Sequence, residues 1–177
     1  LAHILLSGDN LDTQVGGLLG DFVKGPLQGQ YPESVEEGIF LHRQLDAFTD
    51  AQPEVRNLIR TFSPQWRRFA GIIIDIVFDH LLAIHWQEYH SLSLEQFCQR
   101  FYRHLNTCQL LLRLSRQPRR LRRPLPLGKA WPEIVDRHAE IEQVFSSLMP
   151  QLHTYAQQLR FAALTPGVPI LVKRKYG

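Results

Sequence analysis

The segment from Trp66 to Leu81 constrains the fold of this chain most, because its apolar residues recur with the period of a helix. They occupy positions 66, 69, 72, 73, 76, 77 and 81. Ser63 and Pro64 precede them as an N-cap and a first-turn proline, so the sequence predicts one helix from about residue 64 to about Tyr89. Because apolar residues lie on nearly every side, this helix should be central.

Three further helices are predicted. One begins at the acidic turn Glu33 and runs to about residue 50, before the stop at Pro53. A second follows the capping box of Ser93 and Gln96. A third, long and amphipathic, follows residue 132 and should bend at Pro150.

The N-terminal region has weaker helix signals, since Gly16, Gly17 and Gly20 lower the helix propensity between residues 9 and 24. No segment alternates polar and apolar residues between hairpin turns, so no strand is predicted. The sequence therefore predicts an all-α protein. At 177 residues it should form a single compact multi-helix domain over residues 1–177.

Membrane insertion and disulfide bonding are not expected. The longest apolar run, Phe69–Ile74, ends at Asp75, far short of the roughly 20 residues that span a bilayer. No secretory leader is visible. Cys98 and Cys108 make no disulfide framework, and their spacing suits no common zinc motif, so a reduced, cytoplasmic protein is expected.

Positive charge is concentrated in a proline-containing basic segment, defined as residues 113–130. It holds six arginines at positions 113, 116, 119, 120, 122 and 123, and the chain without them would be net negative. Such a segment is typical of a site for an acidic partner, a membrane surface or nucleic acid, and also of a solvated surface. Nucleic acid is the weaker choice, because no aromatic residue lies between Leu110 and Gly128 for base stacking.

Two sets of polar residues on predicted helices are candidates for chemistry. His42, Asp46 and Asp50 are four residues apart and share one helix stripe. Asp75 and Asp79 are again four apart, on the most apolar helix. Carboxylates one turn apart repel each other unless a cation or an arginine lies between them.

Three further residues extend this set. His80 directly follows Asp79, and Asp21 and His3 also lie among apolar residues. Oxygen and imidazole ligands together suit Mn²⁺, Mg²⁺ or Fe²⁺ better than a structural zinc ion.

A purely structural interpretation stays open. Asp75 and Asp79 could pair with arginines in a buried network, and His42 and His80 could be core histidines with satisfied hydrogen bonds. The candidate arginines are Arg43, Arg56 and Arg60. The other histidines are expected to have structural or surface roles; they are His85, His90, His104, His138 and His153.

Several motifs together resemble one known family. The chain opens with Leu1-Ala2-His3, continues with GLLGDFVKG at residues 17–25, and later contains His42-Arg43 and Asp79-His80-Leu81-Leu82. These residues resemble the acyl carrier protein phosphodiesterases, a divergent branch of the HD phosphohydrolase superfamily. The similarity is continuous from residue 1 to about 102 and returns at residues 114–119 and in the C-terminal helix.

The resemblance implies a helical, HD-like fold and a manganese-dependent activity, with Mg²⁺ or Fe²⁺ as alternative metals. The expected reaction hydrolyses the phosphodiester between 4′-phosphopantetheine and a serine of holo acyl carrier protein, which yields the apo form. Acyl carrier protein is acidic, and Arg116, Arg119 and Arg120 are the expected residues that bind it. An HD-type hydrolase of a small phosphoester or nucleotide, and a non-enzymatic helical module that binds acidic proteins or RNA, are the alternatives.

The expected metal ligands are Asp21, His42, Asp79 and His80. Asp46 and Asp75 are expected as further ligands or as groups that orient imidazoles and a water molecule. Arg43 is expected to contact a phosphate oxygen or to form an ordinary salt bridge.

Two departures from the family pattern bear on this assignment. Asp79-His80 reverses the usual His-Asp order, and the chain looks short between about residues 106 and 112. The oligomeric state is not predicted.

Overall fold

The computed structural model describes residues 1–108 and 127–164, and the described residues form ten helices and no strand. This confirms the all-α prediction. The helices are α1 (Ala2–Leu6), α2 (Leu11–Leu19), α3 (Glu33–Ala51), α4 (Pro53–Thr61), α5 (Pro64–Arg67), α6 (Ala70–Ile84), α7 (Trp86–Tyr89), α8 (Leu94–Thr107), α10 (Leu127–Asp136) and α11 (His138–Leu164).

Two predicted helices are confirmed with their local signals. α3 has Glu33 and Glu36 in its first turn. At the start of α8, the Ser93 hydroxyl accepts a hydrogen bond from the Gln96 main chain at 3.2 Å, and the Gln96 side chain accepts one from the Ser93 main chain at 3.1 Å. These are the two reciprocal bonds of a capping box.

The prediction of one continuous helix from residue 64 to residue 89 is wrong. The chain breaks between α5 and α6 and again at His85, where α6 ends. The second break lets the chain turn so that Trp86 is buried against Phe97, with its indole N–H donating to the Leu92 carbonyl at 2.7 Å. Burial of this large aromatic side chain outweighs the continuation of one helix.

The long C-terminal helix begins earlier than predicted and is interrupted once. α10 already starts at Leu127, and Arg137 separates it from α11, which contains Pro150. The Arg137 guanidinium donates to the Thr61 carbonyl and lies 5.6 Å from the centre of the Phe62 ring. The interruption therefore coincides with a contact between the C-terminal helices and the end of α4.

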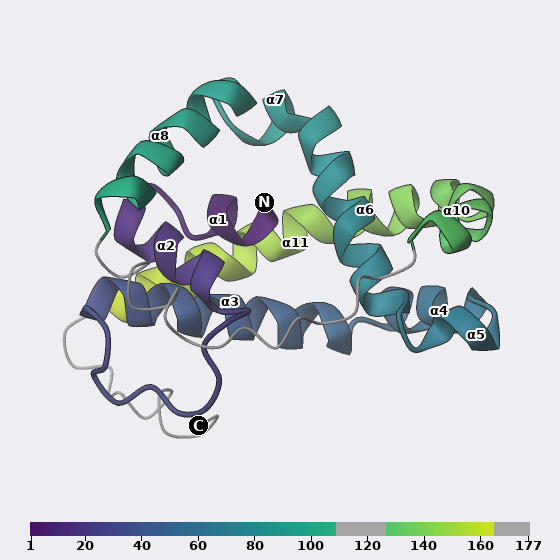
Figure 1. The fold of residues 1–177 in the computed structure, drawn as a ribbon, viewed down its shortest axis with the longest axis horizontal. Coiled ribbons are helices and arrows are strands. Elements are labelled where there is room, and N and C mark those ends of the chain that lie inside the picture. The colour runs from purple at the N-terminus through teal and green to yellow at the C-terminus, as the bar shows by residue number, and fades with distance from the viewer. Residues whose placement is uncertain (109–126, 165–177) are drawn as a thin grey trace.

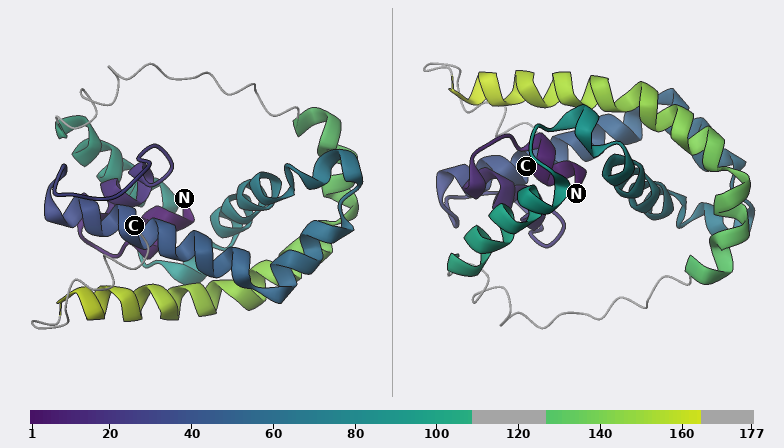
Figure 2. Two further views of the ribbon diagram at one scale, coloured as in Figure 1. Left: turned by 90° about the horizontal axis from the view of Figure 1, so that it is seen from below. Right: turned by 90° about the horizontal axis from the view of Figure 1, so that it is seen from above.

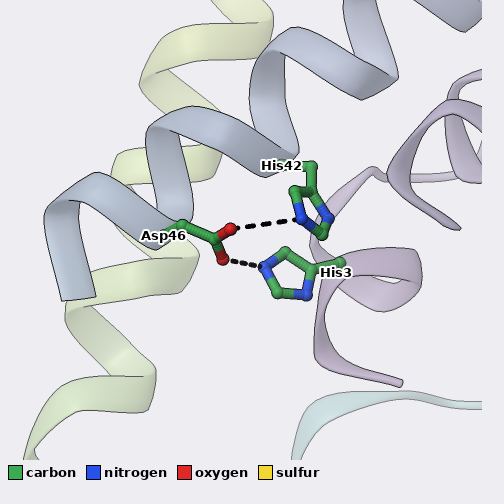
Figure 3. A group of neighbouring side chains, drawn as sticks. All are labelled: His3, His42 and Asp46. Atoms are coloured by element: carbon green, nitrogen blue, oxygen red, sulfur yellow. Dashed lines mark hydrogen bonds and ion pairs between the residues drawn. The ribbon is translucent and has the colours of Figure 1, made fainter. Parts of the chain in front are cut away.

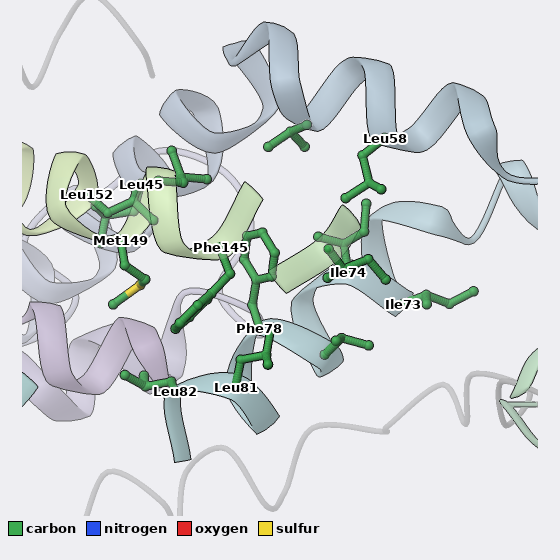
Figure 4. Close-up of a cluster of buried hydrophobic side chains, with 14 of the residues drawn as sticks. Leu45, Leu58, Ile73, Ile74, Phe78, Leu81, Leu82, Phe145, Met149 and Leu152 are labelled. Carbon is green, nitrogen blue, oxygen red and sulfur yellow. The ribbon is translucent and has the colours of Figure 1, made fainter. Parts of the chain in front are cut away.

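The helices surround a main core and a smaller second core. In Figure 1, α8, α7 and α6 form an arch over α1, while α3 and α11 pass beneath and pack against each other. Figure 2 shows the same arrangement from below and from above the view of Figure 1. The main core joins α3, α4, α6 and α11 through residues such as Leu45, Leu58, Phe78 and Phe145, which Figure 4 shows. The second core joins α2, α3 and α8.

Glycines bring α2 and α3 into direct backbone contact. A Cβ atom added to Gly38 would lie 2.7 Å from the Gly16 Cα and closer still to the Thr13 carbonyl oxygen. No larger residue fits at this crossing without moving a helix. The glycines that weaken α2 as an isolated helix are therefore required by its packing, and the Asn10 side chain caps its first turn.

Part of the sequence prediction falls outside the described residues. Arg116, Arg119, Arg120 and most of the basic segment lie there, as does most of the apparently shortened stretch near residues 106–112. Within residues 1–108 and 127–164, no helix combines the length and apolarity needed to cross a membrane.

Candidate metal centre

Helices α1 and α3 bring two imidazoles and one carboxylate together, a group called here the His3 centre: His3, His42 and Asp46. The Nε2 atom of His3 lies 2.9 Å from Asp46 Oδ1, and Nε2 of His42 lies 3.2 Å from Asp46 Oδ2. The two rings are 3.9 Å apart, centroid to centroid. Figure 3 shows that all three side chains point toward one another. One ligand atom from each lies within 4.8 Å of the others, so this group could hold a metal ion.

His42 is oriented by the backbone of α2. Its Nδ1 atom lies 2.8 Å from the Gly17 carbonyl oxygen, which only accepts, so Nδ1 must carry the hydrogen and Nε2 faces Asp46. A Cβ atom on Gly20 would lie 2.6 Å from the His42 Cβ and closer still to its ring. An imidazole whose Nδ1–H is held by a main-chain carbonyl while Nε2 points into a group of ligands is the arrangement that metal-binding histidines adopt.

His3 is positioned by contacts at both ends of α1. Asp79 Oδ1 accepts a hydrogen bond from the Ala2 main-chain nitrogen at 3.0 Å, and Oδ2 accepts one from the Leu1 nitrogen at 2.7 Å. At the other end, the Ser7 hydroxyl donates to the His3 carbonyl at 2.7 Å. Asp79 therefore holds the first turn of α1, and with it His3, against α6.

Opposing effects set the pKa values in the His3 centre. Burial lowers the pKa of His42, but the hydrogen bond and charge of Asp46, the charge of Asp21 and the Gly17 carbonyl together raise it above its usual value. Burial raises the pKa of Asp46, but the imidazoles of His3 and His42 hold it well below its usual range. Asp46 is therefore ionised, and it attracts a positive charge to the two Nε2 atoms.

Three more carboxylates surround this centre. Asp21 Oδ1 lies 3.7 Å from His42 Nε2, and its side chain is 71% exposed. Desolvation raises the pKa of the solvent-facing Asp75 to about 6, and the charges of Asp46, Asp50 and Asp79 contribute. The pKa of Asp50 is also raised, by desolvation and by Asp46. The region therefore holds excess negative charge that a divalent cation would relieve.

Replacing Asp75 with asparagine is expected to stabilise the metal-free protein at pH 8. Asp75 has a folded-state pKa of about 6, above its ordinary value of 3.8, so ionisation disfavours folding as pH rises through this window. Asp75→Asn should raise the free energy of unfolding by on the order of 1 kcal/mol above pH 7, a figure reduced for solvent screening. The gain should vanish below about pH 3, where the carboxyl is protonated in both the folded and the unfolded state. Thermal denaturation in the presence of a chelator measures the difference in stability between the two proteins at pH 8 and at low pH.

The control for this experiment is Asp136→Asn, at an exposed carboxylate that forms no ion pair with other described residues. It should change stability little at either pH. A loss of stability in Asp75→Asn at pH 8 would contradict the interpretation and show that Asp75 is held by a cationic partner.

The structure brings together only some of the predicted site residues. His42, Asp46 and Asp21 lie together, and Asp75 lies close enough for the charge of Asp46 to raise its pKa. Asp79 instead contacts the start of α1. His80 is exposed and forms no hydrogen bond or ion pair with the described part of the chain. The functional roles of all these residues stay predictions.

The arginines considered as structural partners are engaged elsewhere. Arg43 Nη2 donates to the Val23 carbonyl at 3.0 Å, and Arg56 Nε donates to the Asp50 carbonyl at 2.9 Å. Arg60 contacts Asn57 at 3.4 Å. Across residues 1–108 and 127–164, none of the three forms an ion pair with Asp75 or Asp79, so the structure does not contain the buried network of the structural interpretation.

His3 is the member of the centre whose partners the sequence could not indicate. The sequence made it a candidate only because it lies between apolar residues. Its contact with Asp46 joins two residues that are 43 positions apart in the sequence. The supporting role of Gly17 and Gly20 was also missed. The signal was present as three glycines within one short apolar segment, a pattern that indicates close helix packing as well as a weak helix.

Comparisons with known proteins agree on one family. A family model described as acyl carrier protein phosphodiesterase matches residues 1–113, which include the whole His3 centre. The acyl carrier protein phosphodiesterase of Serratia proteamaculans is 40% identical over 143 residues, which cover 80% of this chain and 70% of the relative. Those of Klebsiella pneumoniae and Yersinia pestis are 40% and 41% identical over 98 and 88 residues.

The extent of these matches differs between relatives. The matched segments cover 55% and 50% of this chain, and the chain spans about half the length of the Klebsiella and Yersinia proteins, 51% and 46%. No solved structure matches the chain.

Proposed function

This chain belongs to the acyl carrier protein phosphodiesterase family, and on that premise we propose that it is a metal-dependent phosphodiesterase. Its substrate is holo acyl carrier protein. Hydrolysis of the phosphodiester between 4′-phosphopantetheine and the carrier serine yields apo acyl carrier protein and free phosphopantetheine.

The observation that carries this proposal is the His3 centre. Two imidazole Nε2 atoms face one carboxylate, and one of the imidazoles is oriented by a main-chain carbonyl. This nitrogen and oxygen donor set, without sulfur, suits Mn²⁺, with Mg²⁺ or Fe²⁺ as alternatives. When bound, such a cation lowers the pKa of a coordinated water molecule and neutralises charge on a phosphoryl oxygen.

The surrounding residues position the proposed metal ligands and accept the proton of the attacking water molecule. Gly17 fixes the His42 ring, and Asp79 fixes the helix that carries His3. Asp75, with its pKa near 6, is suited to accept a proton from an attacking water molecule close to neutral pH. Asp21 lies at the exposed edge of the centre, where it can contribute a further ligand.

Two roles in substrate binding follow from the charge of the chain. Arg43 lies beside His42 in sequence and is held through one nitrogen to the Val23 carbonyl, so its other N–H groups are available to a phosphate oxygen. Arg116, Arg119 and Arg120 are proposed to contact the acidic surface of acyl carrier protein. A cytoplasmic location and membership of the HD superfamily also stay predictions.

The expected result is that the purified protein with Mn²⁺ removes phosphopantetheine from holo acyl carrier protein. Mass spectrometry should show the carrier lose the group, and a chelator should stop the reaction until Mn²⁺ is restored. Apo acyl carrier protein, which lacks the scissile bond, is the control substrate.

The same assay distinguishes the alternatives. Turnover of small phosphoesters or nucleotides but not of the carrier would show a small-molecule phosphohydrolase. Tight, salt-sensitive carrier binding that is indifferent to chelators and gives no product would show a binding module.

A further inference from the structure

A second group of possible metal ligands lies where α2 begins and α8 ends. Asp12 is in the first turn of α2, His104 is in the last turn of α8, and Cys108 caps the C-terminus of α8. His104 Nε2 lies 2.8 Å from Asp12 Oδ1. One oxygen, one nitrogen and one sulfur atom of these residues lie within 4.8 Å of one another.

We propose that Asp12, His104 and Cys108 form a second metal site, the Cys108 site, which binds Zn²⁺. Thiolate, imidazole and carboxylate are the three ligand types that zinc takes in proteins, and the fourth tetrahedral position is left for water. The sulfur ligand separates this site from the His3 centre, because thiolate favours Zn²⁺ over Mn²⁺ or Mg²⁺.

The protein holds all three ligands in place by independent contacts. His104 and Cys108 are four residues apart, so they share one face at the end of α8. The Asn10 side chain accepts from the Asp12 main-chain nitrogen at 2.9 Å, which fixes the turn that carries Asp12. Arg100 Nη2 donates to the Asp9 carbonyl at 3.0 Å, which ties α8 to the start of α2.

An ordinary ion pair explains less of this geometry. Such a pair would account for the 2.8 Å contact of Asp12 with His104. It does not require the sulfur atom of Cys108, which packs against the second core, to lie within ligand distance of both groups as it does. The His104 side chain is 26% exposed and that of Asp12 is 49% exposed, so an ion can reach the group from solvent. A bound Zn²⁺ replaces the proton shared by His104 and Asp12 and recruits Cys108 as the third ligand.

A Zn²⁺ ion bound at this site would strengthen the contact between α2 and α8. The same α2 helix carries Gly17, whose carbonyl orients His42. A cation that links the two helices stabilises the folded form by mass action, so Zn²⁺ should raise the melting temperature independently of catalysis.

Cobalt absorption spectroscopy on the reduced full chain tests the proposal. Co²⁺ bound by thiolate gives a near-ultraviolet sulfur-to-metal charge-transfer band, and the His3 centre has no sulfur, so cobalt there gives none. The band should appear in the unmodified protein and in Cys98→Ser, the matched control at the other cysteine. It should be absent in Cys108→Ser, and added Zn²⁺ should remove it from the unmodified protein.

A second variant keeps the test decisive if Cys108→Ser folds poorly. In a His42→Ala background, which removes the His3 centre as a second metal site, His104→Gln should weaken cobalt binding by at least about tenfold and remove most of the zinc-dependent rise in melting temperature. Absence of the band from the unmodified protein would overturn the proposal. So would a band that persists in folded Cys108→Ser or disappears in Cys98→Ser, or a melting temperature that rises equally with zinc when His104→Gln is added to the His42→Ala background.

Discussion

The replacement of His42 by alanine is expected to lower the rate of phosphodiester hydrolysis by about 1000-fold, which corresponds to about 4 kcal/mol of activation free energy. The reason is that His42 has the one fully buried imidazole of the His3 centre and is oriented by Gly17. Its loss removes a proposed metal ligand and leaves Asp46 with one imidazole instead of two. Manganese binding should weaken in parallel.

His80→Ala is the matched control for this experiment. Both positions are histidines on long helices, but His80 is exposed and lies outside the His3 centre. Metal content, manganese affinity and turnover of holo acyl carrier protein are measured for both variants, with circular dichroism to check folding. If His80→Ala loses the metal while folded His42→Ala keeps it, the ligand set is the one suggested by Asp79-His80 and the proposed centre is wrong.

The replacement of Gly38 by alanine is expected to lower the free energy of unfolding by about 3 kcal/mol, at the upper end for overpacking. The added methyl group would lie against the Thr13 carbonyl and the Gly16 Cα, which are backbone atoms that cannot rotate away. α2 and α3 must therefore move apart. That movement also shifts the Gly17 carbonyl that orients His42, so activity should fall with stability.

Gly71→Ala is the control for this substitution. Gly71 is also helical, but a Cβ atom there would meet nothing within 4 Å, so alanine should raise stability by about 0.5–1 kcal/mol through its higher helix propensity. Chemical denaturation of the two variants measures the difference. Equal stability of the two would show that the α2–α3 crossing is looser than described.

Local helix signals could be read from the sequence because each acts within a few residues. The acidic turn at Glu33 and the capping box at Ser93 both occur as predicted. The break at His85 could not be predicted from periodicity, because it depends on the burial of Trp86 against Phe97, a residue of another helix.

The candidate site could be predicted only in part for the same reason, because it too depends on contacts between helices. The spacing of His42 and Asp46 placed them on one stripe, and they do meet, with Nε2 and Oδ2 3.2 Å apart. Asp79 and His80 were grouped because they are adjacent, but consecutive helical residues point about 100° apart. Asp79 accordingly reaches the start of α1 while His80 faces solvent. His3 could enter the site only through the packing of α1.

The sequence by itself determined the helical class, the first-turn signals of α3 and α8, and the family. These depend on spacing along one chain segment or on the residue types themselves. Only the tertiary structure decided that His3 joins His42, that Gly16 and Gly38 touch, and that Cys108 lies beside His104 and Asp12. Contacts between helices depend on how closely and at what angle the helices cross, which no short-range pattern specifies.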